Sequence, residues 1–284
     1  MSALPHNTGV VGGGRMGAGI VHALLTSGSA VTLVEANSEA ATAAADRVIN
    51  SVRSSESRGS LLEPAAVVLE RFKVTSDISA LADCALVIEA VPEIEALKYE
   101  VFRQLEEWTA PTTVLATNTS SLSVNAIAAS IKHSERVLGL HFFNPVPASQ
   151  LIEVVLAEQS APDMAQRARE WVEAMGKTPV VINDSPGFAT TRLGLALGLE
   201  AIRMVEDGVA SPEDIDRALE LGYKHPVGPL RLTDIIGLDV RLDIARYLES
   251  TLGPRFSPPA LMVQMVHDGH LGRKTGQGFY RWEN

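Results

Sequence analysis

Three polar side chains in the middle of the chain have types suited to moving a proton. His141 ends the apolar run that begins near Val137, Glu153 lies on the next apolar run, and Ser120 follows the run Val114–Thr117. Histidine can accept a hydroxyl proton near neutral pH, and a partly buried carboxylate beside it can orient the ring and stabilise its charged form. A serine hydroxyl can hydrogen-bond the reacting oxygen. This set is suited to oxidising an alcohol, in which a base takes the proton as hydride leaves.

Each of the three residues also has an ordinary structural interpretation. Ser120 could cap a helix that begins near Ser123. His141 could be a core histidine with satisfied hydrogen bonds, and Glu153 could point to solvent from its strand. Residue type and spacing leave both interpretations open.

A glycine motif near the N-terminus predicts a dinucleotide site. Residues 12–17 read Gly-Gly-Gly-Arg15-Met16-Gly, which matches G-x-G-x-x-G directly after an expected strand and at the start of an expected helix. Gly12 permits the tight turn, Gly14 lets the backbone approach a pyrophosphate, and Gly17 permits close helix–strand packing. Glu35 ends the second expected strand, where a carboxylate accepts hydrogen bonds from a ribose and repels a 2′-phosphate. The carboxylate of Glu35 therefore favours NAD over NADP as the cofactor.

Short apolar runs alternate with helical patterns over the first two-thirds of the chain. This alternation predicts an α/β fold with a Rossmann-type, doubly wound, mostly parallel sheet. In such a sheet, polar residues at the carboxyl ends of the strands face the ligand crevice. No strand pattern follows Pro186, so we expect a Rossmann-type domain over residues 1–186 and a smaller all-α domain over 187–284.

The expected elements follow from these patterns. The expected strands are Thr8–Val11, Ala30–Val34, Ala85–Val91, Val114–Thr117, Val137–Phe142, Leu151–Leu156 and Pro179–Ile182. The expected helices are 15–27, a segment capped by Ser38, 94–107, 163–175, Leu193–Val205, one that starts at Ser211, Leu230–Leu248 and Pro259–His267.

Composition excludes several classes of protein. The 284 residues carry a formal net charge of −10, which argues against a nucleic-acid partner. The single cysteine, Cys84, excludes a disulfide framework and a cysteine-based zinc cage, and we expect no metal. The longest uncharged run, Trp108–Ile131, is rich in Thr, Ser and Asn, and the N-terminus has no signal-peptide pattern. We therefore expect a cytoplasmic protein with no membrane partner.

The sequence resembles the (S)-3-hydroxyacyl-CoA dehydrogenases from end to end, and among them the short bacterial 3-hydroxybutyryl-CoA dehydrogenases. The matching motifs are Gly12–Gly17, Val87–Glu93, Asn118–Leu122, Gly139–Pro147, Asp184–Phe188, Pro226–Pro229 and Lys274–Tyr280. The resemblance implies reversible NAD-dependent oxidation of a 3-hydroxyacyl-CoA, a step that fatty-acid oxidation and butanoate metabolism both use.

The resemblance also implies a role for each matching residue. His141 is expected to be the catalytic acid/base, Glu153 its partner, and Ser120 a contact of the substrate oxygen. Four residues match positions where the family contacts NAD: Glu93, Lys98, Asn144 and Lys274. Lys98 and Lys274 could instead be ordinary solvated lysines.

The coenzyme A contacts align less well. Ser51 and Arg58 fall roughly where the family contacts coenzyme A, and Arg58 replaces a lysine. From Arg47 to Lys73 there are five basic and three acidic residues, a local reversal of the chain's acidic balance. A positive window suits an anionic ligand, although it could also be a solvated helix.

One position departs from the family. After Pro186-Gly187-Phe188 the family often has Asn just before Arg, and here Thr191 precedes Arg192. In the family this Asn helps to hold the substrate. Threonine keeps one donor and one acceptor but is shorter. Either Thr191 substitutes for Asn through a shorter reach or through a water, or turnover and substrate preference differ from those of the family. Alternatively, Thr191 merely lies in the first turn of a helix.

Two further expectations concern partners and alternatives. Apolar helix faces in the last third of the chain predict a homodimer; their residues are Leu230, Leu232, Ile235, Ile236 and Leu238. A related dehydrogenase of a free hydroxy acid or sugar acid, and a non-catalytic protein that binds NAD and acyl-CoA, remain open as alternatives.

Overall fold

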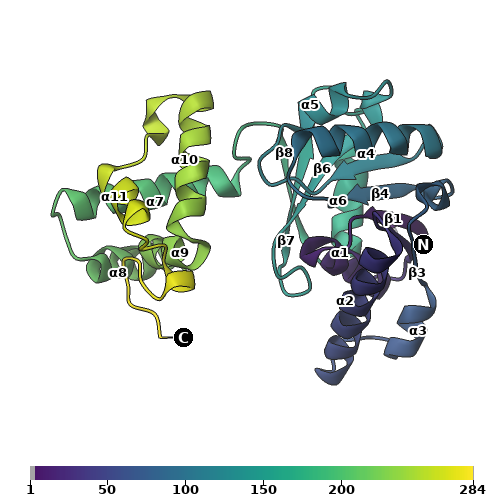
Figure 1. Ribbon diagram of the computed structural model, residues 1–284, viewed down its shortest axis with the longest axis horizontal. Coiled ribbons are helices and arrows are strands. Elements are labelled where there is room, and N and C mark those ends of the chain that lie inside the picture. The colour runs from purple at the N-terminus through teal and green to yellow at the C-terminus, as the bar shows by residue number, and fades with distance from the viewer. Residues whose placement is uncertain (1–3, 284) are drawn as a thin grey trace. The chain divides into compact units, whose positions relative to one another are not determined.

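A computed structural model describes residues 4–283 of the chain. It divides into two compact units, one ending at Ser185 and one beginning at Pro186. Each is described by itself below (Figure 1). None of the helices in the described range is both long and apolar enough to cross a lipid bilayer.

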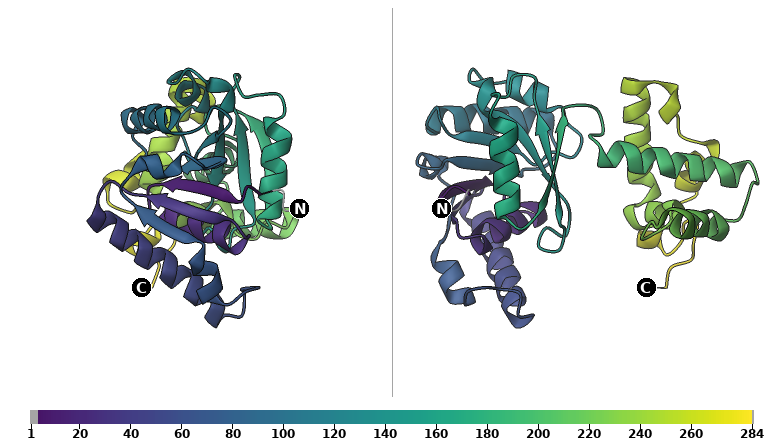
Figure 2. Two further views of the ribbon diagram at one scale, coloured as in Figure 1. Left: turned by 90° about the vertical axis from the view of Figure 1, so that its right-hand side faces the viewer. Right: turned by 180° about the vertical axis from the view of Figure 1, so that it is seen from behind.

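The first unit is an eight-stranded sheet covered by helices on both faces (Figure 2). The strand order is β3-β2-β1-β4-β5-β6-β7-β8, and every neighbouring pair is parallel except β6 and β7. This arrangement confirms the predicted Rossmann-type fold with a mostly parallel sheet. The strands are β1 (Asn7–Val11), β2 (Ala30–Val34), β3 (Phe72–Thr75), β4 (Leu86–Glu89), β5 (Val114–Thr117), β6 (Val137–Phe142), β7 (Leu151–Leu156) and β8 (Thr178–Asn183).

Helices α1, α2, α3 and α6 share one apolar core with the sheet. Val21, Leu24 and Leu25 of α1 and Val48 and Val52 of α2 are excluded from solvent in this core. Burial of this kind stabilises the fold by about 1.5–3 kcal/mol for each large aliphatic side chain. The helices of the unit are α1 (Arg15–Thr26), α2 (Ser38–Ser57), α3 (Ala65–Glu70), α4 (Glu95–Trp108), α5 (Val124–Ala129) and α6 (Met164–Ala174).

Two N-terminal caps differ from expectation. The cap of α2 is Asn37, whose Oδ1 accepts from Ala40 N at 2.9 Å, so the prediction of Ser38 as the cap is wrong by one residue. The cap of α5 is Ser123, whose Oγ accepts from Ala126 N at 3.2 Å. Ser120 therefore does not cap α5, and the interpretation of Ser120 as a helix cap is wrong.

The second unit is built from five α-helices in its described part. They are α7 (Thr190–Glu206), α8 (Pro212–Tyr223), α9 (Pro229–Ile236), α10 (Leu238–Leu252) and α11 (Ala260–His267). The predicted single helix Leu230–Leu248 is wrong, because Gly237 interrupts it with φ +111° and separates α9 from α10. A positive φ of this kind is readily adopted only by glycine.

The second unit has its own apolar core. Leu230 belongs to this core, and Leu230 and Leu238 are both 0% exposed, so neither is part of an external face. Ile235 and Ile236 remain on the surface, at 37% and 43% exposure. Asp234 anchors the C-terminal segment, because its carboxylate accepts from Phe279 N, Tyr280 N and Trp282 Nε1 at 2.9–3.0 Å.

Candidate active site

His141 and Glu153 are brought together by the one antiparallel ladder among the described strand pairs. They are register partners across β6 and β7, and His141 Nδ1 lies 2.8 Å from Glu153 Oε2. The histidine is 7% exposed and the glutamate 0% exposed. The alternative in which Glu153 points to solvent is therefore wrong. A buried carboxylate at hydrogen-bond distance fixes the orientation of the ring.

The loop that carries Ser120 is organised by the carboxylate of Glu93. Glu93 Oε1 accepts a hydrogen bond from Thr119 Oγ1, and it also accepts from Ser120 N at 3.0 Å and Ser121 N at 3.2 Å. Burial by itself would raise the pKa of Glu93, but Lys98 and the donors of Thr119 and Ser120 outweigh it, and the pKa lies below its usual value. Ser120 itself is exposed.

Lys98 is among the most deeply buried residues of the chain. Its ammonium lies 2.7 Å from Glu89 Oε1 and 3.2 Å from Glu93 Oε2, and its side chain is 1% exposed. The alternative of an ordinary solvated lysine is wrong for Lys98. Glu89 ends β4 and also accepts from Thr117 Oγ1 at 2.7 Å, so the carboxyl ends of β4 and β5 are joined through it. Sequence reasoning assigned no role to Glu89.

Two further hydrogen bonds join the loops around these strands. Asn118 Oδ1 accepts from Phe142 N at 2.9 Å, which ties the Ser120 loop to the residue after His141. Asp184 Oδ2 accepts from Ser123 Oγ at 2.7 Å and from Asn125 N at 2.9 Å. Asn144 is exposed, three residues after His141.

The glycine motif lies at the edge of a cavity of about 810 Å³. Gly12 has φ +94°, and a Cβ on Gly17 would lie 1.8 Å from Gly12 O, so both positions require glycine. No side chain caps the N-terminus of α1, and no acidic residue stands in its first turn. The cavity lining includes Gly12, Gly14, Arg15, Met16 and Glu35.

Glu35 stands over the turn that the glycines make. Its Oε1 accepts from Gly13 N at 2.6 Å and its Oε2 from Ala36 N at 3.1 Å. The carboxylate therefore lies beside the open helix N-terminus. An uncapped helix start that attracts phosphate, next to an acid that accepts from ribose hydroxyls, is a donor and acceptor set that fits a dinucleotide.

Four predicted site residues remain, Ser51 and Arg58 in the first unit and Thr191 and Lys274 in the second. Ser51 Oγ lies 3.0 Å from His22 Nδ1, and Arg58 donates to Ser54 Oγ and Ser55 Oγ at 2.6 and 3.0 Å. Thr191 and Lys274 belong to the second unit. Thr191 is in the first turn of α7, and Lys274 Nζ pairs with Asp239 Oδ2 at 2.5 Å.

Comparison with known proteins supplies the family. A model described as "3-hydroxyacyl-CoA dehydrogenase, NAD binding domain" matches residues 7–185, and one described as "3-hydroxyacyl-CoA dehydrogenase, C-terminal domain" matches residues 187–282. Together they span both units.

Three relatives agree along their whole length. A 3-hydroxybutyryl-CoA dehydrogenase of Mycobacterium tuberculosis is 42% identical, with 99% of this chain and 100% of the relative covered. A probable 3-hydroxybutyryl-CoA dehydrogenase of Deinococcus radiodurans is 39% identical, with 96% of this chain and 99% of the relative covered. The crystal structure of (S)-3-hydroxybutyryl-CoA dehydrogenase from Ralstonia eutropha is 34% identical, with a TM-score of 0.93 over 99% of this chain and 100% of that one. The chain therefore belongs to the 3-hydroxyacyl-CoA dehydrogenase family.

Proposed function

We propose that the protein catalyses the reversible NAD-dependent oxidation of a (S)-3-hydroxyacyl-CoA to the 3-oxoacyl-CoA, with short-chain substrates such as 3-hydroxybutyryl-CoA preferred. The observation that carries the chemistry is the buried pair His141–Glu153, in a chain with the family's two domains. The preference for a short acyl chain rests on the names of the relatives.

The N-terminal domain, residues 1–186, holds NAD and the catalytic pair. The turn at Gly12, Gly14 and Gly17, with Arg15 and Met16, borders the cavity for the pyrophosphate, and Glu35 accepts from the adenosine ribose. Glu93, Asn144 and Lys274 are proposed as further contacts of the cofactor, and Lys98 acts on it through Glu93. Because Lys98 is buried between two carboxylates, its share is to hold Glu93 in place.

The proton is handled by His141. Bound NAD⁺ supplies the acceptor for the hydride that leaves C3. His141 takes the proton of the C3 hydroxyl on the ring nitrogen opposite Nδ1, and Glu153 stabilises the imidazolium so formed. Ser120 donates to the reacting oxygen, and in the reverse direction His141 returns the proton to that oxygen. General acid–base assistance of this kind contributes about 10²–10⁴-fold to the rate.

In the C-terminal domain, residues 187–284, Thr191 is the residue that we propose as a substrate contact, and the domain supports a homodimer. Several of its apolar side chains are exposed; they are Leu193, Leu197, Ile235, Ile236 and Val240 on α7, α9 and α10. Exposed apolar side chains on neighbouring helices favour association with a second copy. Sedimentation at micromolar concentration should give the mass of two chains, and a stable monomer would refute the dimer.

The activity is tested by following NADH absorbance with 3-hydroxyacyl-CoAs of increasing chain length. We expect the highest kcat/KM with the four-carbon substrate and none with free 3-hydroxybutyrate. Oxidation of the free acid at a comparable rate would transfer the assignment to a hydroxy-acid dehydrogenase. Binding of both ligands without any absorbance change would indicate a non-catalytic protein.

A further inference from the structure

Glu89, at the carboxyl end of β4, accepts three hydrogen bonds on one buried carboxylate. Its Oε1 accepts from Val91 N at 2.8 Å and from Lys98 Nζ at 2.7 Å. Its Oε2 accepts from Thr117 Oγ1 at 2.7 Å, and its backbone oxygen accepts from Asn118 N at 2.8 Å. A single residue therefore contacts both the loop that follows β4 and the start of the loop that follows β5.

These contacts continue through Lys98 and close on themselves. Lys98 Nζ also lies 3.2 Å from Glu93 Oε2, and Glu93 Oε1 accepts from Thr119 Oγ1. Thr119 is two residues after Thr117, so the backbone leads back to the hydroxyl that donates to Glu89. The closed set, the Glu89 ring, consists of the side chains of Glu89, Lys98, Glu93, Thr119 and Thr117.

The Glu89 ring holds the loop of Ser120 at its base and at its tip. The base is bonded to Glu89 through Thr117, and the tip is bonded to Glu93 through Ser120 N at 3.0 Å. Lys98 bridges the two carboxylates, so the base and the tip share one buried cation. In a buried network of this kind, loss of one hydrogen bond weakens its neighbours.

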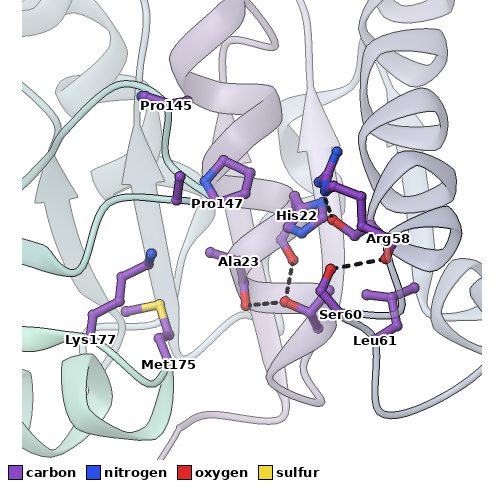
Figure 3. A pocket seen from close by; sticks show the side chains of 12 residues that line it. His22, Ala23, Arg58, Ser60, Leu61, Pro145, Pro147, Met175 and Lys177 are labelled. Atoms are coloured by element: carbon purple, nitrogen blue, oxygen red, sulfur yellow. Dashed lines mark hydrogen bonds between the residues drawn. The ribbon is translucent and has the colours of Figure 1, made fainter.

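Three members of the ring are closed off from solvent. Glu89, Lys98 and Thr117 are 0% exposed, and none of them lines the cavity at the glycine motif. The unit has a second cavity of about 530 Å³, lined by His22 and Arg58 among other residues (Figure 3), and the three ring members do not line it either. They can therefore affect a reaction only through the residues that they hold.

We propose that Glu89 is a positioning residue of the reaction, which acts through the Glu89 ring to fix the Ser120 hydroxyl where it meets the reacting oxygen. The inference rests on the proposed function, in which Ser120 contacts that oxygen, and it deepens it by giving a role to Glu89. Ser120 itself is exposed, so its placement depends on the buried part of the ring. A donor that is displaced from the developing charge loses most of its effect on the rate.

The test measures the value of the Ser120 hydroxyl with the ring intact and with the ring broken. Ser120→Ala should lower kcat/KM for 3-hydroxybutyryl-CoA by about tenfold in the wild type, the value of one hydrogen bond to a developing charge. Thr117→Val removes the hydroxyl that donates to Glu89 Oε2. In this background Ser120→Ala should cost less than about threefold, because a misplaced hydroxyl has little left to lose. Glu89→Gln should reduce the effect of Ser120→Ala in the same way.

Thr113→Val is the matched control. Thr113 Oγ1 donates to Cys84 O at 2.7 Å, so the substitution removes a buried hydrogen bond between the segments that enter β4 and β5, at the opposite ends of the same strands. In this background Ser120→Ala should keep its tenfold effect. An equal reduction in Thr113→Val and Thr117→Val would show that any loosening of these strands suffices. A full tenfold effect in Thr117→Val would show that Ser120 does not depend on the ring. Either result overturns the proposal.

Hydrogen exchange measures the loop without turnover. The amides of Ser120 and Ser121 donate to Glu93, and they should exchange about tenfold faster in Thr117→Val and Glu89→Gln than in the wild type. They should keep the wild-type rate in Thr113→Val. If Glu89→Gln does not fold, Thr117→Val decides alone, and unchanged exchange there would refute the ring. A wild type that does not oxidise hydroxyacyl-CoA would contradict the proposed function, while the exchange rates would still show whether Glu89 holds the loop.

Discussion

Glu153 Oε2 lies 2.8 Å from His141 Nδ1 because the two residues are direct partners in the β6–β7 ladder. Both backbones are held by strand pairing, so neither side chain depends on a loop for its position. The pair therefore has the fixed geometry that a general acid/base requires.

His141→Ala should lower kcat by about 10²–10⁴-fold and leave the affinity for NAD at its wild-type value, since the general base alone is removed. Glu153→Gln keeps a hydrogen-bonding group of the same size beside the ring but removes the charge that stabilises the imidazolium. We expect a loss of at least about tenfold, smaller than that of His141→Ala. Steady-state kinetics measures kcat for both variants, and fluorescence titration measures their affinity for NAD. A near-normal kcat in His141→Ala would refute the role of His141 as the general base.

Lys98→Met should destabilise the N-terminal domain by about 3–5 kcal/mol, because the buried carboxylate of Glu89 loses its counter-ion. Urea unfolding followed by circular dichroism measures the change. Pairing the substitution with Glu89→Gln should recover a large part of the loss, since the fully buried position 89 then carries no unpaired charge. If the double variant is as unstable as the sum of the singles, the two residues are not coupled.

The stability of the N-terminal domain should fall as the pH drops from about 6.5 towards 4. The pKa of His22 is about 4 in the folded protein, below the usual value of 6.5, so the unfolded chain binds more protons in this window. The free energy of unfolding should therefore decrease by up to about 3 kcal/mol across it. Above pH 6.5 the free energy of unfolding no longer depends on the protonation of His22.

His22→Gln, which keeps a polar group near Ser51, should flatten this pH dependence. His6→Gln replaces an exposed histidine and serves as the control. Unfolding midpoints measured at several pH values distinguish the two. An equal slope in the wild type and in His22→Gln would show that other groups cause the acid sensitivity.

Thr191→Asn should raise kcat/KM for the hydroxyacyl-CoA by about 2–10-fold, the value of one added hydrogen bond. Thr191→Val keeps the volume but removes the hydroxyl, and it should lower kcat/KM. If both substitutions leave kcat/KM unchanged, Thr191 serves only as part of the first turn of α7.

Strong local patterns were sufficient to predict much of the sheet. The predicted bounds Val114–Thr117, Val137–Phe142 and Leu151–Leu156 match β5, β6 and β7 residue for residue, because continuous apolar runs bounded by polar residues mark buried strands. Strand β3 and helix α3 went unpredicted; both are short, and Phe72–Thr75 is only partly buried with Lys73 exposed.

The contacts within the candidate active site were harder to predict from the sequence than the strands. His141 and Glu153 could be chosen by residue type, but only strand register shows that they are partners. The sequence does not show that Lys98 is buried, since that depends on the fold bringing the carboxylates of Glu89, at the end of β4, and Glu93, before α4, onto its ammonium. The sequence places His22 in a helix, but it does not show that Arg58 and Lys177 lie near the ring and lower its pKa.

Helix α1 borders both cavities of the first unit described above. Met16 borders the first cavity and His22 the second, and six helical residues separate them by about 9 Å along the axis. Each residue also turns the helix by about 100°. One residue inserted between Met16 and His22 would therefore rotate one of these side chains away from its cavity while leaving the other in place. In this family member the length of a single helix therefore fixes how two cavities of the N-terminal unit are placed relative to one another.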